Sequence, residues 1–200
     1  MSPDFEPRVR VSVGFAALTI WFAAVNGPGL LAMMLSAAAL HELGHWLALG
    51  LCGVEVRGLR IGLLGAVLEA DCARLSYGRE LAAVLAGPGM NLLCAWALSR
   101  LGPPGVEAAV GAHLVLGGFN LLPLRPLDGG RALYLLTAWA WGPWAGDRAA
   151  RWAGTVSALL LSGGLLWLMG QTGGSLWLLP AAAGLLGAAG REWFGKPGIS

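Results

Sequence analysis

Residues 11–40 form an apolar stretch without a single charged side chain, and this stretch limits the environments in which the chain can fold. Runs of 18 or more apolar residues are typical of helices that cross a lipid bilayer. Other apolar runs follow, so the first is not merely a cleaved signal peptide. Only 12% of the 200 residues are charged, against about 25% in soluble domains. We therefore predict an all-α polytopic membrane protein.

Glycines and prolines set the boundaries of the predicted helices. Residues 26–29, Asn-Gly-Pro-Gly, form one predicted turn, and Gly142 with Pro143 ends a short helix at residues 131–141. We expect residues 1–200 to form a single integral-membrane domain with its core at residues 30–141. The predicted membrane spans, about six in all, are residues 9–25, 30–51, 80–98, 106–122, 149–169 and 176–190.

The segment between the second and third predicted spans has a different pattern. Residues 54–57, Val-Glu-Val-Arg, alternate apolar and polar side chains, as a half-exposed strand does. Gly58 interrupts the alternation, which indicates a bulge or a turn. The alternation resumes at residues 59–61, and residues 66–70 are suited to form a partner strand. We predict a small β-hairpin or sheet at the membrane surface.

The basic residues predict the orientation in the membrane. With a cytoplasmic N-terminus and alternating spans, every Lys and Arg except Arg100 falls on the cytoplasmic side, as the positive-inside rule requires. We expect a multi-pass protein of a bacterial cell membrane with both termini in the cytoplasm. The net charge of +2 is too small to indicate a nucleic-acid partner. Cys52, Cys72 and Cys94 lack a Cys-x-x-Cys spacing, so they indicate neither a disulfide framework nor a zinc cluster.

Residues 41–45, His-Glu-Leu-Gly-His, lie inside the second predicted span. Residues four apart share one face of a helix, so the imidazoles of His41 and His45 can bind one metal ion, for which zinc is the usual choice. Glu42 lies next to the first histidine, where a carboxylate can take a proton from metal-bound water. This His-Glu-x-x-His pattern is the signature of zinc proteases. Ionisable side chains at membrane depth are costly and usually functional, which favours a site over a polar packing cluster.

A catalytic zinc ion normally has three protein ligands, so a third ligand is expected elsewhere in the chain. The candidates are His113, Glu69, Asp71 and Asp128. A lone histidine on an apolar helix is usually a packing residue, and the two carboxylates of the hairpin are expected to be solvated. Asp128 has the best context, because prolines precede it, glycines follow it, and irregular backbone can turn a carboxylate back toward the second span.

The chain resembles the site-2 protease family of intramembrane zinc metalloproteases. The resemblance rests on residues 41–45 and on residues 120–131, Asn-Leu-Leu-Pro-Leu-Arg-Pro-Leu-Asp-Gly-Gly-Arg, and it covers most of residues 30–141. Residues 87–91, Gly-Pro-Gly-Met-Asn, are similar to a glycine-and-asparagine motif of that family. The compact form resembles the bacterial sporulation-type branch, the stage IV sporulation protein FB group. The resemblance implies that Asp128 is the third zinc ligand.

Together the motif and the resemblance predict an intramembrane zinc metalloprotease. The expected reaction is hydrolysis of a peptide bond within or near the transmembrane segment of a membrane-bound protein, with Glu42 as the base that activates water. Asn91 or Asn120 could hydrogen-bond the substrate backbone or the oxyanion, and either could instead hold helices together. The expected partners are a membrane-anchored protein substrate, the lipid bilayer and a membrane protein as regulator.

The expected site lies roughly 10–15 Å inside the cytoplasmic boundary, because the motif precedes the end of its span by only a few turns. A substrate helix must unwind there, and the edge of the hairpin could pair with the unwound segment. One alternative is a catalytically silent protein of the same fold that binds a partner helix. Another is a metal transporter, although the outer half of the chain offers few polar residues for a transit path.

Overall fold

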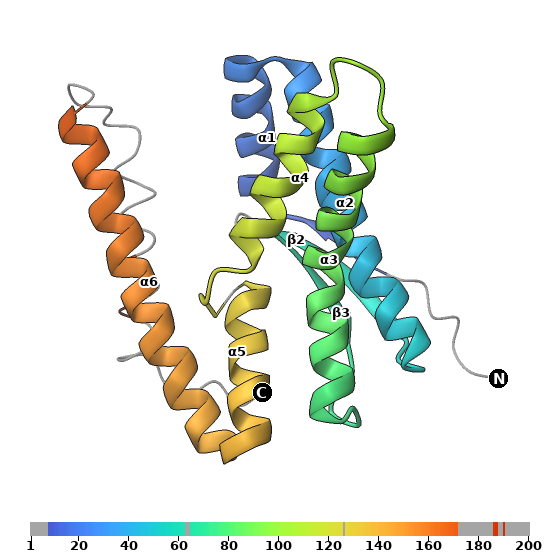
Figure 1. Cartoon of the computed structure of the whole chain (residues 1–200), viewed down its shortest axis with the longest axis vertical. Coiled ribbons are helices and arrows are strands. Elements are labelled where there is room, and N and C mark those ends of the chain that lie inside the picture. The colour runs from blue at the N-terminus through green and yellow to red at the C-terminus, as the bar shows by residue number, and fades with distance from the viewer. Residues whose placement is uncertain (1–7, 63–64, 126, 172–185, 188–189, 191–200) are drawn as a thin grey trace. The chain divides into compact units, whose positions relative to one another are not determined.

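Helices make up most of the structure, a computed structural model that describes residues 8–62, 65–125, 127–171, 186–187 and 190 (Figure 1). Two compact units, Met1–Leu121 and Leu122–Ser200, are described in turn. The first unit contains β1 (Arg8–Val11), α1 (Val13–Asn26), α2 (Pro28–Leu51), β2 (Val56–Gly62), β3 (Gly65–Ala70), α3 (Tyr77–Leu101) and α4 (Glu107–Asn120). The second contains α5 (Asp128–Trp141) and α6 (Pro143–Gln171). The predicted fold class, helical with a small sheet, is confirmed.

Small residues bring the helices of the first unit close together, with α2 packing against α3 and α4 (Figure 1). A Cβ atom on Gly44 would lie 2.5 Å from the carbonyl oxygen of Ala86, so only glycine permits this approach of α2 to α3. Likewise, a Cβ atom on Gly117 of α4 would lie 3.0 Å from the Cβ of Asn91 on α3. Close approach through small residues is the usual packing mode of helices in membranes.

Large apolar side chains lie on the outside of the helices and small ones lie inside. The buried core of the first unit includes Ala37, Ala83, Ala95 and Ala112, whereas leucines, valines and tryptophans are exposed. This distribution is the reverse of the one in a soluble protein, where large apolar side chains are buried, and it suits contact with lipid.

Three helices of the described residues, α2, α3 and α6, are long and apolar enough to cross a membrane. They correspond to the predicted spans at residues 30–51, 80–98 and 149–169. Helices α1 and α4 occupy predicted positions but have 14 residues each. Such a helix is about 21 Å long, less than the hydrocarbon thickness of about 30 Å. The span at residues 176–190 falls almost entirely outside the described residues, so the number of six spans stays a prediction.

The sheet has three strands in the order β1-β2-β3. Strands β2 and β3 are antiparallel, as predicted, and their register shifts between Val56 and Gly58, where the sequence indicates a bulge. The strand β1 was not predicted: residues 9–25 were expected to be one helix, but residues 8–11 pair in parallel with β2. The Ser12 hydroxyl then accepts a hydrogen bond from the Phe15 backbone N–H at 3.1 Å and caps α1.

The second unit is a helix pair preceded by a tight turn. Gly142 separates α5 from α6, and its φ of 90° is a backbone conformation that residues with a side chain rarely adopt. Leu124 and Leu127 of the turn are buried with Ala158 of α6. A Cβ atom on Gly130 would overlap the carbonyl of Leu124, so the start of α5 packs directly on the turn backbone. The helix predicted at residues 131–141 is therefore confirmed, and it begins earlier, at Asp128.

Candidate metal centre

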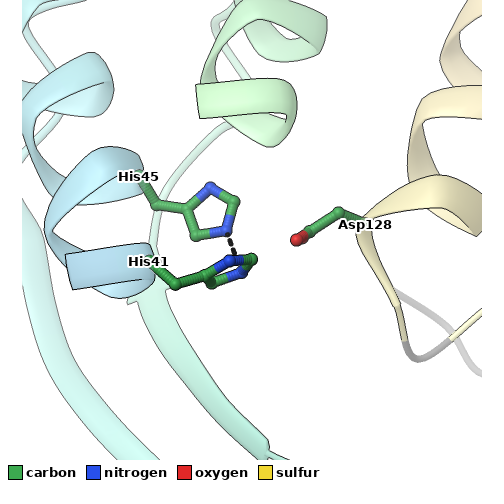
Figure 2. Close-up of side chains that lie close together, drawn as sticks. All are labelled: His41, His45 and Asp128. Carbon is green, nitrogen blue, oxygen red and sulfur yellow. Dashed lines mark hydrogen bonds between the residues drawn. The ribbon is translucent and has the colours of Figure 1, made fainter. Parts of the chain in front are cut away.

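The two histidines of the motif lie on the same face of α2 with their rings in contact (Figure 2). The ring centroids are 4.8 Å apart and the ring planes are nearly perpendicular, at 81°. The Nε2 atoms of His41 and His45 are 3.1 Å apart. The ring of His41 is buried, with only 5% of its surface exposed, and His45 is half-buried. The i, i+4 spacing therefore brings two potential ligand nitrogens together as predicted.

The outer nitrogen of each ring faces an oxygen. His41 Nδ1 lies 2.6 Å from Asn91 Oδ1, and His45 Nδ1 lies 2.8 Å from the carbonyl oxygen of Ala83. Carbonyl and amide oxygens only accept hydrogen bonds, so both Nδ1 atoms carry the hydrogen. In the neutral imidazoles the lone pairs are then on the two Nε2 atoms.

This arrangement favours a proton or a metal ion between the rings. Two lone pairs that face each other at 3.1 Å repel unless a proton or a metal ion lies between them. Two Zn–N bonds of about 2.0–2.1 Å in a tetrahedral site separate the nitrogens by about 3.3 Å, close to the spacing found here. Donation of Nδ1–H to a carbonyl group is also how zinc-binding histidines are usually oriented. The pair therefore fits zinc in its nitrogen spacing and in its outer hydrogen bonds.

Helix α3 leaves room for the His45 ring at Gly87. A Cβ atom on Gly87 would overlap the imidazole, so a larger residue would displace the ring. Helix α3 thus contributes to the site in three ways: an acceptor at Ala83, a space at Gly87 and an amide at Asn91.

Glu42 and Asp128 are the predicted base and the predicted third ligand. Glu42 is half-buried on α2, directly after His41. Asp128 is half-buried at the first position of α5, after the turn of the second unit (Figure 2). His41, His45 and Asp128 supply two imidazoles and one carboxylate, a donor set that could hold a metal ion. Zinc commonly binds such sets in catalytic sites.

No family model matches the sequence. A search of solved structures finds the site-2 protease from Methanocaldococcus jannaschii, with a TM-score of 0.68 and 21% identity; the match covers 100% of this chain and 97% of the other. The chain has the site-2 protease fold. The predicted resemblance to this family is confirmed, and the sporulation-type branch stays a prediction.

Relatives in sequence are proteins named as zinc metalloproteases. The provisionally named zinc metalloprotease Rip3 of Mycobacterium tuberculosis is 32% identical over 165 residues, which is 74% of this chain and 40% of Rip3. Zinc metalloprotease MJ0392 of Methanocaldococcus jannaschii is 28% identical over 138 residues, which is 64% of this chain and 40% of the relative. The chain thus spans about two fifths of the length of each of these relatives.

The other predicted ligands have different partners. Glu69 pairs with Arg60 at 2.5 Å across β2 and β3, and Asp71 lies 3.8 Å from Arg57. Glu69 on β3 and Asp71 just after it thus each lie beside an arginine of β2. His113 is buried on α4, where its Nδ1 lies 3.0 Å from the amide nitrogen of Asn91.

The two predicted substrate-binding asparagines lie in different surroundings. Asn91 is completely buried, and its amide contacts His41, His113 and the Ala37 carbonyl. It therefore lies behind His41 in this site-2 protease fold. Asn120 is half-buried near the end of α4 and donates to the carbonyl of Leu116 at 3.0 Å. The sequence signal for the contacts of Asn91 was the presence of an amide and a histidine in apolar helices. The sequence did not show which residues Asn91 contacts.

Proposed function

We propose that this chain is an intramembrane zinc metalloprotease that hydrolyses a peptide bond within or near the transmembrane segment of a membrane-bound protein. The observation that carries the proposal is the facing Nε2 pair of His41 and His45, whose spacing fits a bound zinc ion, on a helix long enough to cross a membrane. The site-2 protease fold and the names of the sequence relatives support the same reaction.

In the proposed enzyme His41, His45 and Asp128 bind the zinc ion. When bound, the zinc ion would act as a Lewis acid and lower the pKa of a water molecule on it toward about 7. Asn91 and the Ala83 carbonyl hold the two imidazoles with their Nε2 lone pairs in the site. The carboxylate of Asp128 adds a negative charge at the first turn of α5, where the helix dipole favours it.

Glu42 acts as general base and then as general acid. Its carboxylate accepts the proton of the attacking water and passes a proton to the leaving amine. Its position beside His41 on α2 supports this role. Asn120 is proposed to hydrogen-bond the substrate backbone near the reacting carbonyl.

The position of the motif on α2 suggests where the substrate is cut. His41 and His45 precede the end of α2 at Leu51 by a distance of about 9–15 Å along the helix axis. A helical substrate hides its carbonyl groups, so the segment to be cut must be extended. Strand β2 is the middle strand of the sheet, so both of its edges are paired. We propose the outer edge of β3, the other strand of the predicted hairpin, as the surface that pairs with this segment.

The proposed orientation puts the N-terminus, the sheet and the C-terminus in the cytoplasm. It is supported by the positions of the basic residues, all of which except Arg100 then lie on the cytoplasmic side. The cut would therefore fall nearer the cytoplasmic end of the substrate segment.

The Glu42→Gln variant tests the proposed function. The purified wild-type chain and the variant should bind one zinc ion equally, because glutamine preserves the size of the side chain and Glu42 is not a proposed ligand. On co-expression with candidate single-span membrane proteins, only the wild type should release a cleaved product. Cleavage by Glu42→Gln at the wild-type rate would contradict the mechanism, and a wild-type chain that binds no zinc would contradict the proposed function.

A further inference from the structure

Asn91 links the histidine pair to a third buried histidine. The residues come from three helices: His41 from α2, Asn91 from α3 and His113 from α4. Asn91 is 0% exposed, His113 is 4% exposed and His41 is 5% exposed. The Asn91 amide lies 2.6 Å from His41 through its oxygen and 3.0 Å from His113 through its nitrogen.

A backbone carbonyl fixes the orientation of the Asn91 amide. Asn91 Nδ2 lies 3.0 Å from the carbonyl oxygen of Ala37, and two oxygens at this distance would repel. The nitrogen must therefore face Ala37 and donate a hydrogen bond. The amide oxygen is then held toward His41 Nδ1, which has to donate to it.

The second hydrogen of the amide nitrogen goes to His113. Since the amide donates, His113 Nδ1 must accept, and a neutral His113 then carries its hydrogen on Nε2. A hydrogen on His113 Nδ1 would face the amide N–H and push the amide out of this orientation. The hydrogen position on His113 is thus coupled through Asn91 to the hydrogen position on His41.

We propose that Asn91 and His113 are positioning residues that hold His41 in the tautomer with its Nε2 lone pair available to the metal. This inference rests on the proposed function, because it concerns the zinc ligand His41. Residues that hydrogen-bond the outer nitrogen of a zinc-binding histidine contribute about 10- to 100-fold to metal affinity. The side chains of His41, Asn91 and His113 are buried, so water does not compete for the hydrogen bonds between them.

The first test measures zinc affinity of the full-length chain by competition with a chelator. His113→Leu removes the acceptor and should lower zinc affinity by about 10-fold, whereas His113→Gln, whose amide oxygen can accept, should stay within about 3-fold of the wild type. Leu116→Ala is the matched control, because it creates space on the same helix without touching the hydrogen bonds. It should lose thermal stability without losing zinc affinity.

The second test asks whether His113 acts through Asn91. Asn91→Leu should lower zinc affinity by about 10- to 100-fold, and adding His113→Leu to it should cause no further loss. An additional loss equal to that of His113→Leu alone would overturn the coupling. So would wild-type affinity in the His113→Leu variant.

The ¹⁵N NMR chemical shifts of the histidine imidazoles test the inference on the wild-type chain alone, so this measurement does not depend on whether a variant folds. We expect the hydrogen of His41 on Nδ1 and that of His113 on Nε2. A hydrogen on His113 Nδ1 would overturn the inference. Failure of the proposed function is distinguishable, because the wild-type chain would then bind no zinc, whereas failure of the inference leaves wild-type zinc binding intact.

Discussion

Gly87 lies so close to the imidazole of His45 that a methyl group on residue 87 would overlap the ring. Helix α3 is therefore shaped around a side chain of α2, and the geometry of the histidine pair depends on a residue that carries no functional group. The same helix supplies the Ala83 carbonyl that orients His45.

Replacing Gly87 by alanine should displace the His45 ring and lower zinc affinity by at least about 10-fold, because the ring loses its spacing to His41 and its hydrogen bond to Ala83. The free energy of unfolding should fall by about 1–3 kcal/mol through overpacking. Zinc titration and thermal unfolding of the full chain measure the two effects. Gly89→Ala on the same helix meets nothing within 4 Å and is the control, expected to leave both unchanged or slightly raise stability.

Replacing Asp128 by asparagine should lower zinc affinity by at least about 10-fold, because the site loses its negatively charged ligand while the shape of the side chain is kept. Glu69→Gln and Asp71→Asn remove equivalent charges from the sheet, where each carboxylate lies near an arginine. These two variants should bind zinc like the wild type. A loss of zinc in either of them, with Asp128→Asn unaffected, would identify a different third ligand.

A proline scan along residues 67–69 tests whether β3 pairs with the substrate. Successive residues of an edge strand point their N–H groups alternately toward the neighbouring strand and outward. Proline at an outward position should reduce cleavage and leave thermal stability nearly unchanged, whereas proline at an inward position should reduce both. Unchanged cleavage throughout the scan would rule out pairing at this edge.

Reporter fusions test the orientation in the membrane. A phosphatase that is active only outside the cytoplasm should be active when fused after residue 104 and inactive when fused after residues 73 or 142. The reason is that the segment around Arg100 is the one expected outside. The opposite pattern at residues 104 and 73 would reverse the proposed orientation.

The sequence predicted the histidine pair and the β2–β3 hairpin because both depend on local spacing. The i, i+4 spacing of His41 and His45 determines their shared helix face, and Gly58 marked the bulge. The strand β1 was missed because Val9 and Val11 merge with the apolar run that follows and because its partner lies about fifty residues away.

There is a physical reason why the sequence did not predict the residues that surround the site. The acceptor for His45 is a backbone carbonyl, which every residue has, so no side chain identifies Ala83. The contact of Asn91 with His41 and His113 depends on how three helices rotate about their axes, which apolar sequences leave nearly undetermined. Polar residues in apolar helices identified the participants, and the packing decided their pairing.

The pairing of β1 with β2 has a topological consequence that is independent of any charge. An open sheet does not form inside the hydrocarbon layer, so both strands must lie on one side of the membrane. The chain between Val11 and Val56 therefore crosses an even number of times. If α2 crosses, α1 must cross as well, although its 14 residues cover only about 21 Å. A span this short is accommodated by local thinning of the bilayer, by flanking side chains that extend to the interface or by association with other helices, so the sheet places this demand on the surroundings of α1.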